Sequence, residues 1–141
     1  MKRENKMENM KEYILEKYND FEVREIQSGY RCKTYLISKK SEKYIYQIYF
    51  EHTKYQARKK EYVTKLVKEK VEINEIPNII ELGENEEFSY LVSELKPGRE
   101  LTYNKNFNFN VFYNDLARIL VKIHSVEIGH KFRLDRSKWI R

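Results

Sequence analysis

Cysteine is almost absent from this chain, since Cys32 is the single thiol among 141 residues. One thiol excludes an internal disulfide and any zinc site that needs several thiolates. No stretch of about 18 consecutive apolar residues occurs, which is the length that a membrane-spanning helix needs. The opening residues MKRENK precede no apolar segment, so we expect no secretory signal. We therefore expect a protein of the cytoplasm that has no membrane partner.

The net charge of +6 does not by itself indicate a nucleic-acid partner. Lysine and glutamate alternate along most of the chain, which is typical of solvated helix faces. The basic excess lies in residues 131–141, where Asp135 is the only acid, and the aromatic and basic residues form no known nucleic-acid motif. Apolar residues make up 40% of the chain, with twelve Tyr and seven Phe, which predicts one compact domain.

The common reactive side chains form no recognisable catalytic or metal site. Cys32 lies in an expected strand with no histidine nearby in sequence, which favours a buried structural thiol over a nucleophile. His124 falls on the apolar stripe of the last expected helix, where a packing role is favoured. His52 and His130 have no second ligand at a metal-binding spacing.

Hydrophobic periodicity predicts a chain that passes from strands to helix around residues 88–101. Three amphipathic helices are expected at 7–18, 55–71 and 110–126. Five strands are expected at 21–28, 31–38, 44–50, 79–83 and 88–95. The breakers Lys96, Pro97 and Gly98 follow the last strand. A strand-to-linker hinge of this kind is a natural place for a flat ligand.

The order helix, three strands, helix, two strands, helix is the plan of the small lobe of protein-kinase-like phosphotransferases. Five segments carry a closer likeness: SGYRCKTYLI (28–37), YIYQIY (44–49), PNIIELG (77–83), YLVSELKPG (90–98) and LARILVKIHS (116–125). In this order they resemble the aminoglycoside and choline kinase-like phosphotransferase family. The likeness runs from about residue 21 to residue 126.

The resemblance implies an α+β fold, a kinase-like small lobe with a five-stranded antiparallel sheet and one inserted helix. In the chain, this lobe is preceded and followed by helices. It also implies four parts. The first three are an N-terminal helix at 1–18, a nucleotide lobe with its hinge at 19–101 and a post-hinge helix at 102–126. The fourth, residues 127–141, would be a basic tail or the start of a C-terminal lobe that this sequence lacks.

Gln47 is where the chain departs from the family. The family's phosphate-pairing lysine matches Gln47, and the acid that holds this lysine matches Glu61. An amide can donate a hydrogen bond to phosphate but neutralises no charge. Gln47 is therefore either a degraded phosphate contact or a polar residue on a half-exposed strand. Without the lysine, a surface glutamate is the favoured explanation of Glu61.

The resemblance also implies a nucleobase site roofed by aliphatic side chains. Ile45 and Gln47 lie on the same face of their expected strand, and Thr34 or Leu36 could face the same cleft. Core packing alone would also explain Ile45 and Leu36.

Backbone groups complete the implied nucleotide site. The hinge backbone of Glu94, Leu95 and Lys96 would supply hydrogen bonds to the base. Gly29 would allow a turn close to phosphate, although one glycine is a weak signal. No Walker A sequence or glycine-rich kinase loop is present.

The chain lacks the residues that would complete phosphoryl transfer. Family members need an aspartate to activate the acceptor, an asparagine a few residues later, and another aspartate for magnesium. Only Asp20, Asp115 and Asp135 are present, and none of them follows a histidine in a His-x-Asp sequence. The missing C-terminal lobe would also have to supply the magnesium site.

We therefore expect the nucleotide-binding N-terminal lobe of an ATP- or GTP-dependent small-molecule phosphotransferase, inactive alone. It would take an acceptor only with a C-terminal lobe. The alternatives are a stand-alone, catalytically silent binding protein and a basic interaction module that shares only the architecture. A lobe without its partner should expose apolar surface around the hinge and last helix, or self-associate.

Overall fold

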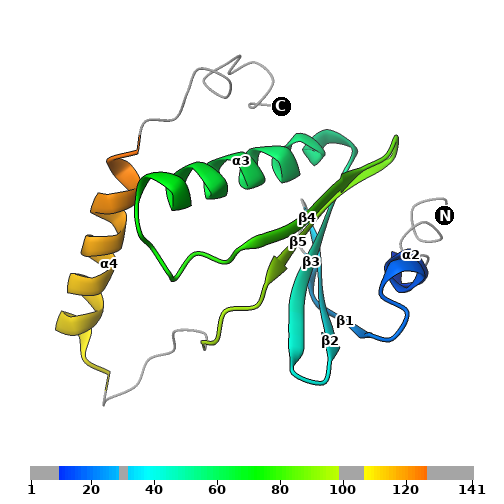
Figure 1. The fold of residues 1–141 in the computed structure, drawn as a ribbon, viewed down its shortest axis with the longest axis horizontal. Helices are drawn as coiled ribbons and strands as arrows, with labels where there is room; N and C mark the ends of the chain where they lie inside the picture. The colour runs from blue at the N-terminus through cyan, green and yellow to red at the C-terminus, as the bar shows by residue number, and fades with distance from the viewer. Residues whose placement is uncertain (1–9, 29–31, 99–106, 127–141) are drawn as a thin grey trace. The chain divides into compact units, whose positions relative to one another are not determined.

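A computed structural model describes residues 10–28, 32–98 and 107–126. The elements are α2 (Met10–Lys17), β1 (Glu22–Ser28), β2 (Lys33–Lys39), β3 (Glu42–Phe50), the 3-10 turn η1 (Glu51–Thr53), α3 (Tyr55–Lys70), β4 (Ile79–Glu84), β5 (Phe88–Glu94) and α4 (Phe109–His124) (Figure 1). This sequence of elements confirms the predicted order of helices and strands.

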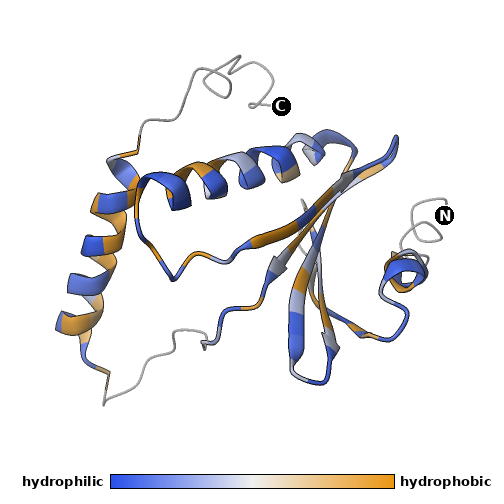
Figure 2. Cartoon of the chain, in the orientation of Figure 1, coloured by the Kyte–Doolittle hydropathy of each residue, from blue (hydrophilic) through white to orange (hydrophobic). Residues whose placement is uncertain are grey.

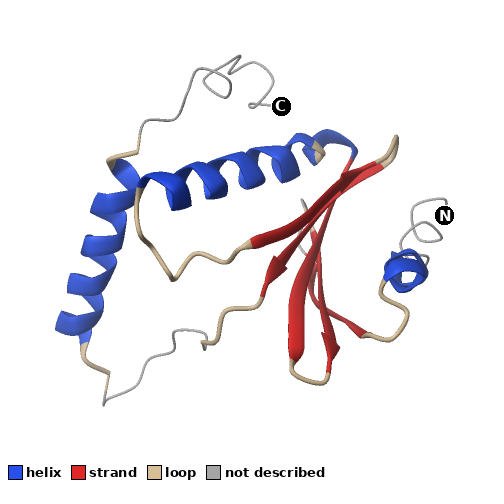
Figure 3. Ribbon diagram, in the orientation of Figure 1, coloured by secondary structure: helices blue, strands red, loops and turns tan. Residues whose placement is uncertain are grey.

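The strands form one antiparallel sheet in the order β1-β2-β3-β5-β4 (Figure 3). Hairpins connect β1 to β2, β2 to β3, and β4 to β5, whereas α3 lies between β3 and β4 in the chain. The predicted α+β class with a five-stranded antiparallel sheet and an inserted helix is therefore confirmed.

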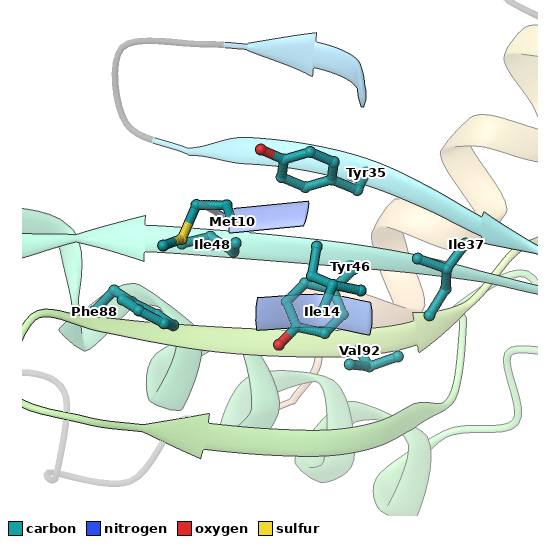
Figure 4. Close-up of a cluster of buried hydrophobic side chains, with 8 residues drawn as sticks. All are labelled: Met10, Ile14, Tyr35, Ile37, Tyr46, Ile48, Phe88 and Val92. Carbon is teal, nitrogen blue, oxygen red and sulfur yellow. The ribbon is translucent and has the colours of Figure 1, made fainter. Parts of the chain in front are cut away.

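One face of the sheet, which we call the core face, packs against α2. Alternation along β2 puts Tyr35 and Ile37 on this face, and both are at most 1% exposed. Met10 and Ile14, one turn apart on α2, meet them there (Figure 4). The buried cluster is Met10, Ile14, Tyr35, Ile37, Tyr46, Ile48, Phe88 and Val92. Burial of each large aliphatic side chain contributes roughly 1.5–3 kcal/mol, so α2 is integral to this layer.

A polar contact fastens the end of α2 to β4. The Tyr18 hydroxyl donates to Glu81 at 2.7 Å and the Tyr90 hydroxyl at 2.8 Å, while Lys17 forms an ion pair with the same carboxylate. Burial alone would raise the pKa of Glu81, but these three donors outweigh it and hold the pKa below its usual value. The carboxylate is therefore ionised at neutral pH, where it accepts both hydrogen bonds and keeps its ion pair.

The chain divides into two compact units. The first combines Met1–Arg58 with Asn78–Leu95 and contains the sheet; the second combines Lys59–Pro77 with Lys96–Arg141 and contains most of α3 and all of α4. Within the second unit, Arg118 of α4 pairs with Glu75 at 3.3 Å, and Lys122 donates to the carbonyl of Glu72 at 3.4 Å. These contacts attach the basic side of α4 to the segment that follows α3.

Helix α4 begins one residue before its predicted start because Asn108 caps it. The Asn108 side-chain oxygen accepts the backbone N–H of Val111 at 3.2 Å. The helix alternates apolar and polar residues (Figure 2), yet none of its residues is buried. The predicted packing role of His124 is therefore wrong, since His124 is exposed.

Large apolar side chains lie exposed along α4, the last helix, where exposed apolar surface is predicted. Those that stand out to solvent are Phe109, Val111, Tyr113, Leu116, Leu120 and Val121, with exposed fractions of 39–69%. At the end of β5, in the first unit, Leu95 is 40% exposed. Whether copies of the chain associate through this surface stays a prediction.

Candidate functional site

Two neighbouring cross-strand pairs form the centre of the candidate site. Thr34 of β2 pairs with Gln47 of β3, and Leu36 pairs with Ile45. Residues directly opposite each other in an antiparallel pair share a face. These four side chains therefore lie together on the face opposite the core face, which we call the open face. Their assignment to a nucleotide stays a prediction.

The side chains of the open face are less buried than those of the core face. Thr34, Leu36, Ile45 and Gln47 are all half-buried, whereas Ile37 and Ile48 of the same strands are fully buried. Strand β5 supplies buried neighbours, because Leu91 pairs with Gln47 and Ser93 pairs with Ile45. The half-buried side chains thus combine a fixed position in the sheet with surface that a ligand can contact.

One end of the open face is polar. The Tyr49 hydroxyl donates to Oε1 of Gln47 at 3.4 Å, and Cys32 Sγ lies 3.8 Å from Thr34 Oγ1. Burial, with the adjacent Cys32 as a smaller cause, raises the pKa of Tyr49, so its hydroxyl keeps its proton at neutral pH. Leu36 and Ile45 form the apolar end, two residues further along the strands. The open face therefore changes from polar to apolar between one pair on this face and the next.

Cys32 and Tyr49 are members of the site that the sequence prediction did not name. Tyr49 lies two residues from Gln47 on the same strand, so strand alternation would have identified it. Cys32 is only half-buried, which corrects the predicted buried thiol. It precedes the first residue of β2 and packs at the edge of a small cluster of Tyr49, Ala57 and Leu91.

Glu61 belongs to the second unit and has a local partner there. Its carboxylate lies 3.5 Å from Lys65 Nζ, four residues later on α3, and its side chain is 25% exposed. Such i, i+4 pairs are common on solvated helices and contribute a few tenths of a kcal/mol. Its predicted role beside Gln47 stays a prediction.

The hinge backbone is partly used by the sheet. The N–H of Glu94 donates to the Asn78 carbonyl at 3.0 Å, and the N–H of Leu95 donates to the Lys43 carbonyl at 3.3 Å. These two amides therefore already donate to backbone carbonyls within the first unit. Of the predicted hydrogen bonds to a base, those from the amides of Glu94 and Leu95 are thus already replaced by bonds within the protein. Lys96 belongs to the second unit. Gly29 lies outside the described residues.

Metal ligands do not gather in the described ranges. No group of three or more His, Cys, Asp and Glu residues there is arranged to hold a metal ion. Likewise, no helix in the described part of the chain is long and apolar enough to cross a membrane.

Comparison with solved structures identifies the fold. No protein-family model matches the chain, and no curated protein matches it significantly. A thermostable mutant of aminoglycoside phosphotransferase APH(4)-Ia, in a ternary complex with AMP-PNP and hygromycin B, is similar over 64% of this chain and 30% of its own, with a TM-score of 0.51 at 15% identity. A putative fructosamine-3-kinase from Haemophilus somnus 129PT is similar over 84% of this chain and 39% of its own, with a TM-score of 0.53 at 16% identity.

The chain spans 30–39% of the length of these two proteins. The TM-scores of 0.51 and 0.53 establish a common fold, whereas identities of 15–16% leave activity open. The sheet order, the helix inserted after β3 and the matched structures agree with one another. The chain therefore has the protein-kinase-like fold, and its partial coverage of these proteins fits the N-terminal lobe.

Proposed function

We propose that this chain is the nucleotide-binding N-terminal lobe of a small-molecule phosphotransferase similar to aminoglycoside and choline kinases. The observation that carries the proposal is the open face, where the Leu36–Ile45 pair adjoins the Thr34–Gln47 pair. A nucleobase is flat and apolar on its faces, whereas the attached ribose carries hydroxyls. Aliphatic side chains beside neutral hydrogen-bonding groups suit that combination.

The spacing of the two pairs also suits a nucleoside. Two residues along a strand cover roughly 6.6 Å, about the separation between a base and its sugar. We assign the base to Leu36 and Ile45, and the sugar side to Thr34 and Gln47. The backbone of Glu94 and Leu95 remains a proposed contact of the same ligand, through groups other than the two amides that already bond within the first unit.

The ligands bound in the similar structures support the ligand class. The aminoglycoside phosphotransferase was crystallised with AMP-PNP and with hygromycin B, and another mutant of it with ADP and hygromycin B. We propose ATP or GTP as the nucleotide for this chain. The small-molecule acceptor and magnesium would require a C-terminal lobe, and the cytoplasm is the proposed location.

We propose that the chain has no transferase activity by itself. Asp20 forms an exposed ion pair with Lys39 at 3.0 Å, and Asp115 lies exposed on α4. Asp135 lies outside the described residues. Neither described aspartate belongs to a group of three or more His, Cys, Asp and Glu residues arranged to hold a metal ion.

A catalytically silent, stand-alone binding protein is the second candidate. Gln47 favours it, because loss of a phosphate-pairing cation matters less where no phosphoryl group is transferred. Both candidates require nucleotide binding, whereas a purely architectural interaction module does not. Binding is therefore the first property to test.

Thermal unfolding with ATP and GTP, each with magnesium, tests the proposal. A ligand that binds only the native state at about 100 times its Kd stabilises it by about 2.7 kcal/mol. We expect a rise in Tm that Ile45→Ala reduces and Ile80→Ala leaves unchanged, since Ile80 is a 51% exposed residue on β4. Absence of any shift at millimolar nucleotide would overturn the proposal.

A further inference from the structure

Resting on the nucleotide-binding function proposed above, we infer that the open face recognises the nucleoside part of its ligand and gains little from the phosphates. Gln47 is then a specificity-determining residue that sets the ratio of ATP affinity to nucleoside affinity. The ligand class is a nucleoside, with or without phosphates.

The first support is the neutrality of the polar end. Thr34, Gln47 and the protonated Tyr49 carry no charge, and they are linked by cross-strand pairing and by the Tyr49–Gln47 hydrogen bond. A polyphosphate carries several negative charges, and binding it strongly requires cationic partners. Neutral donors of this kind match ribose hydroxyls better than ionised phosphate.

The second support is where the cations of the sheet lie. Among the described strand residues, the register assigns Arg24 and Lys43 to the open face. Arg24 pairs with Leu36 at the apolar end, and Lys43 pairs with Ser38, still further from Thr34. Both therefore stand at the end assigned to the base.

Three other cations that the structure describes in the first unit form contacts elsewhere. Lys33 lies on the core face, 7% exposed, with its amine 3.8 Å from Glu25. Lys54, just before α3, and Arg58, in its first turn, both pair with Glu84 on the edge strand β4. Lys33 pairs with Ile48, one step along the ladder from Gln47 but on the opposite face, whereas Lys54 and Arg58 lie outside the strands.

The Tyr49 contact also fixes how Gln47 can act. Because the Tyr49 hydroxyl donates to Oε1, the amide nitrogen of Gln47 is the donor end. A single neutral amide donor suits a sugar hydroxyl or a ring nitrogen. It provides no Coulomb attraction that would grow from nucleoside to triphosphate.

Titration of the full chain with adenosine and with Mg-ATP, at low and at moderate salt, tests this inference. We expect the two Kd values to agree within about threefold, and neither to change strongly with salt. An ATP affinity more than about tenfold above the adenosine affinity would overturn the inference while leaving the proposed function intact. Failure of both ligands to bind would overturn both.

Two charge variants of nearly equal size sharpen the result. Gln47→Lys should raise the ratio of ATP affinity to adenosine affinity about tenfold, since a partly buried cation–phosphate contact is charge-assisted. Gln47→Glu, which keeps the side-chain shape, should weaken ATP selectively. Melting curves of both variants exclude a folding defect as the cause. Equal effects on ATP and adenosine would show that Gln47 does not set the preference.

Discussion

Gly83 on β4 pairs with Tyr90 on β5, and the tip of the Tyr90 ring occupies the space where a side chain at position 83 would begin. The ring is held there from two sides. It stacks on Tyr46, with ring centroids 5.1 Å apart, and its hydroxyl donates to Glu81. The absence of a side chain at position 83 is thus what lets β4, β5 and α2 meet around one carboxylate.

Gly83→Ala should displace the Tyr90 ring and break its hydrogen bond to Glu81. We expect a loss of about 1–3 kcal/mol in the free energy of unfolding, measured by urea denaturation. Gly98→Ala is the matched control, because nothing lies within 4 Å of the added methyl group there. Equal stability of the two variants would show that the ring moves aside without cost.

The Glu81 carboxylate should make stability depend on acid pH. Its pKa lies below the usual value in the folded chain, so its contribution is present above the unfolded pKa of about 4.3. That contribution is lost as the pH falls through the lower folded value. Glu81→Gln should therefore be clearly less stable than the unmodified chain at pH 7, and the difference should shrink towards pH 2. A difference that stays constant with pH would contradict this role.

Neighbouring residues of β2 should separate stability from binding. Ile37 is 0% exposed on the core face, so Ile37→Ala should cost about 2–5 kcal/mol. Leu36 is half-buried on the open face, and Leu36→Ala should cost about 1 kcal/mol while weakening nucleotide binding. Denaturation and nucleotide titration of both variants check the division. A Leu36→Ala variant that binds normally would remove Leu36 from the site.

The exposed apolar side of α4 should bind an apolar dye or promote self-association. Leu116 and Leu120 are 39% and 40% exposed and lie one turn apart. Replacing both by Glu should lower dye fluorescence and any concentration dependence in sedimentation. Asn114→Glu, which adds charge on another side of the helix, is the control. A monomeric chain with no dye binding would contradict the expectation.

The order and type of the elements follow directly from the sequence because alternation and helical periodicity are local. Tyr35 and Ile37 alternate with half-buried Thr34 and Leu36, and every strand ends within two residues of its predicted bounds. The β-bulges in the two edge strands, in contrast, could not be predicted from local patterns. Both edge strands lose register at an isoleucine, Ile26 on β1 and Ile80 on β4, and no local pattern predicts which residue leaves the ladder.

The candidate site was predictable in part. Side-chain alternation along the strand predicts that Ile45 and Gln47 share a face. The pairing of β2 with β3 puts Thr34 and Leu36 on that same face. The Glu81 contact was not predictable, because Tyr18 and Glu81 are 63 residues apart in the chain. The use of the Leu95 amide by Lys43 likewise depends on the pairing of β3 with β5, which local patterns do not determine.

Methyl NMR of the isotope-labelled chain during a titration with ATP tests the central claim most directly. The account predicts that the methyl signals of Ile45 and Leu36 on the open face shift together in a saturable manner, while those of Ile37 and Val92 in the core cluster stay in place. Saturable shifts confined to the core cluster or to α4, or no shifts at millimolar ATP, would contradict it.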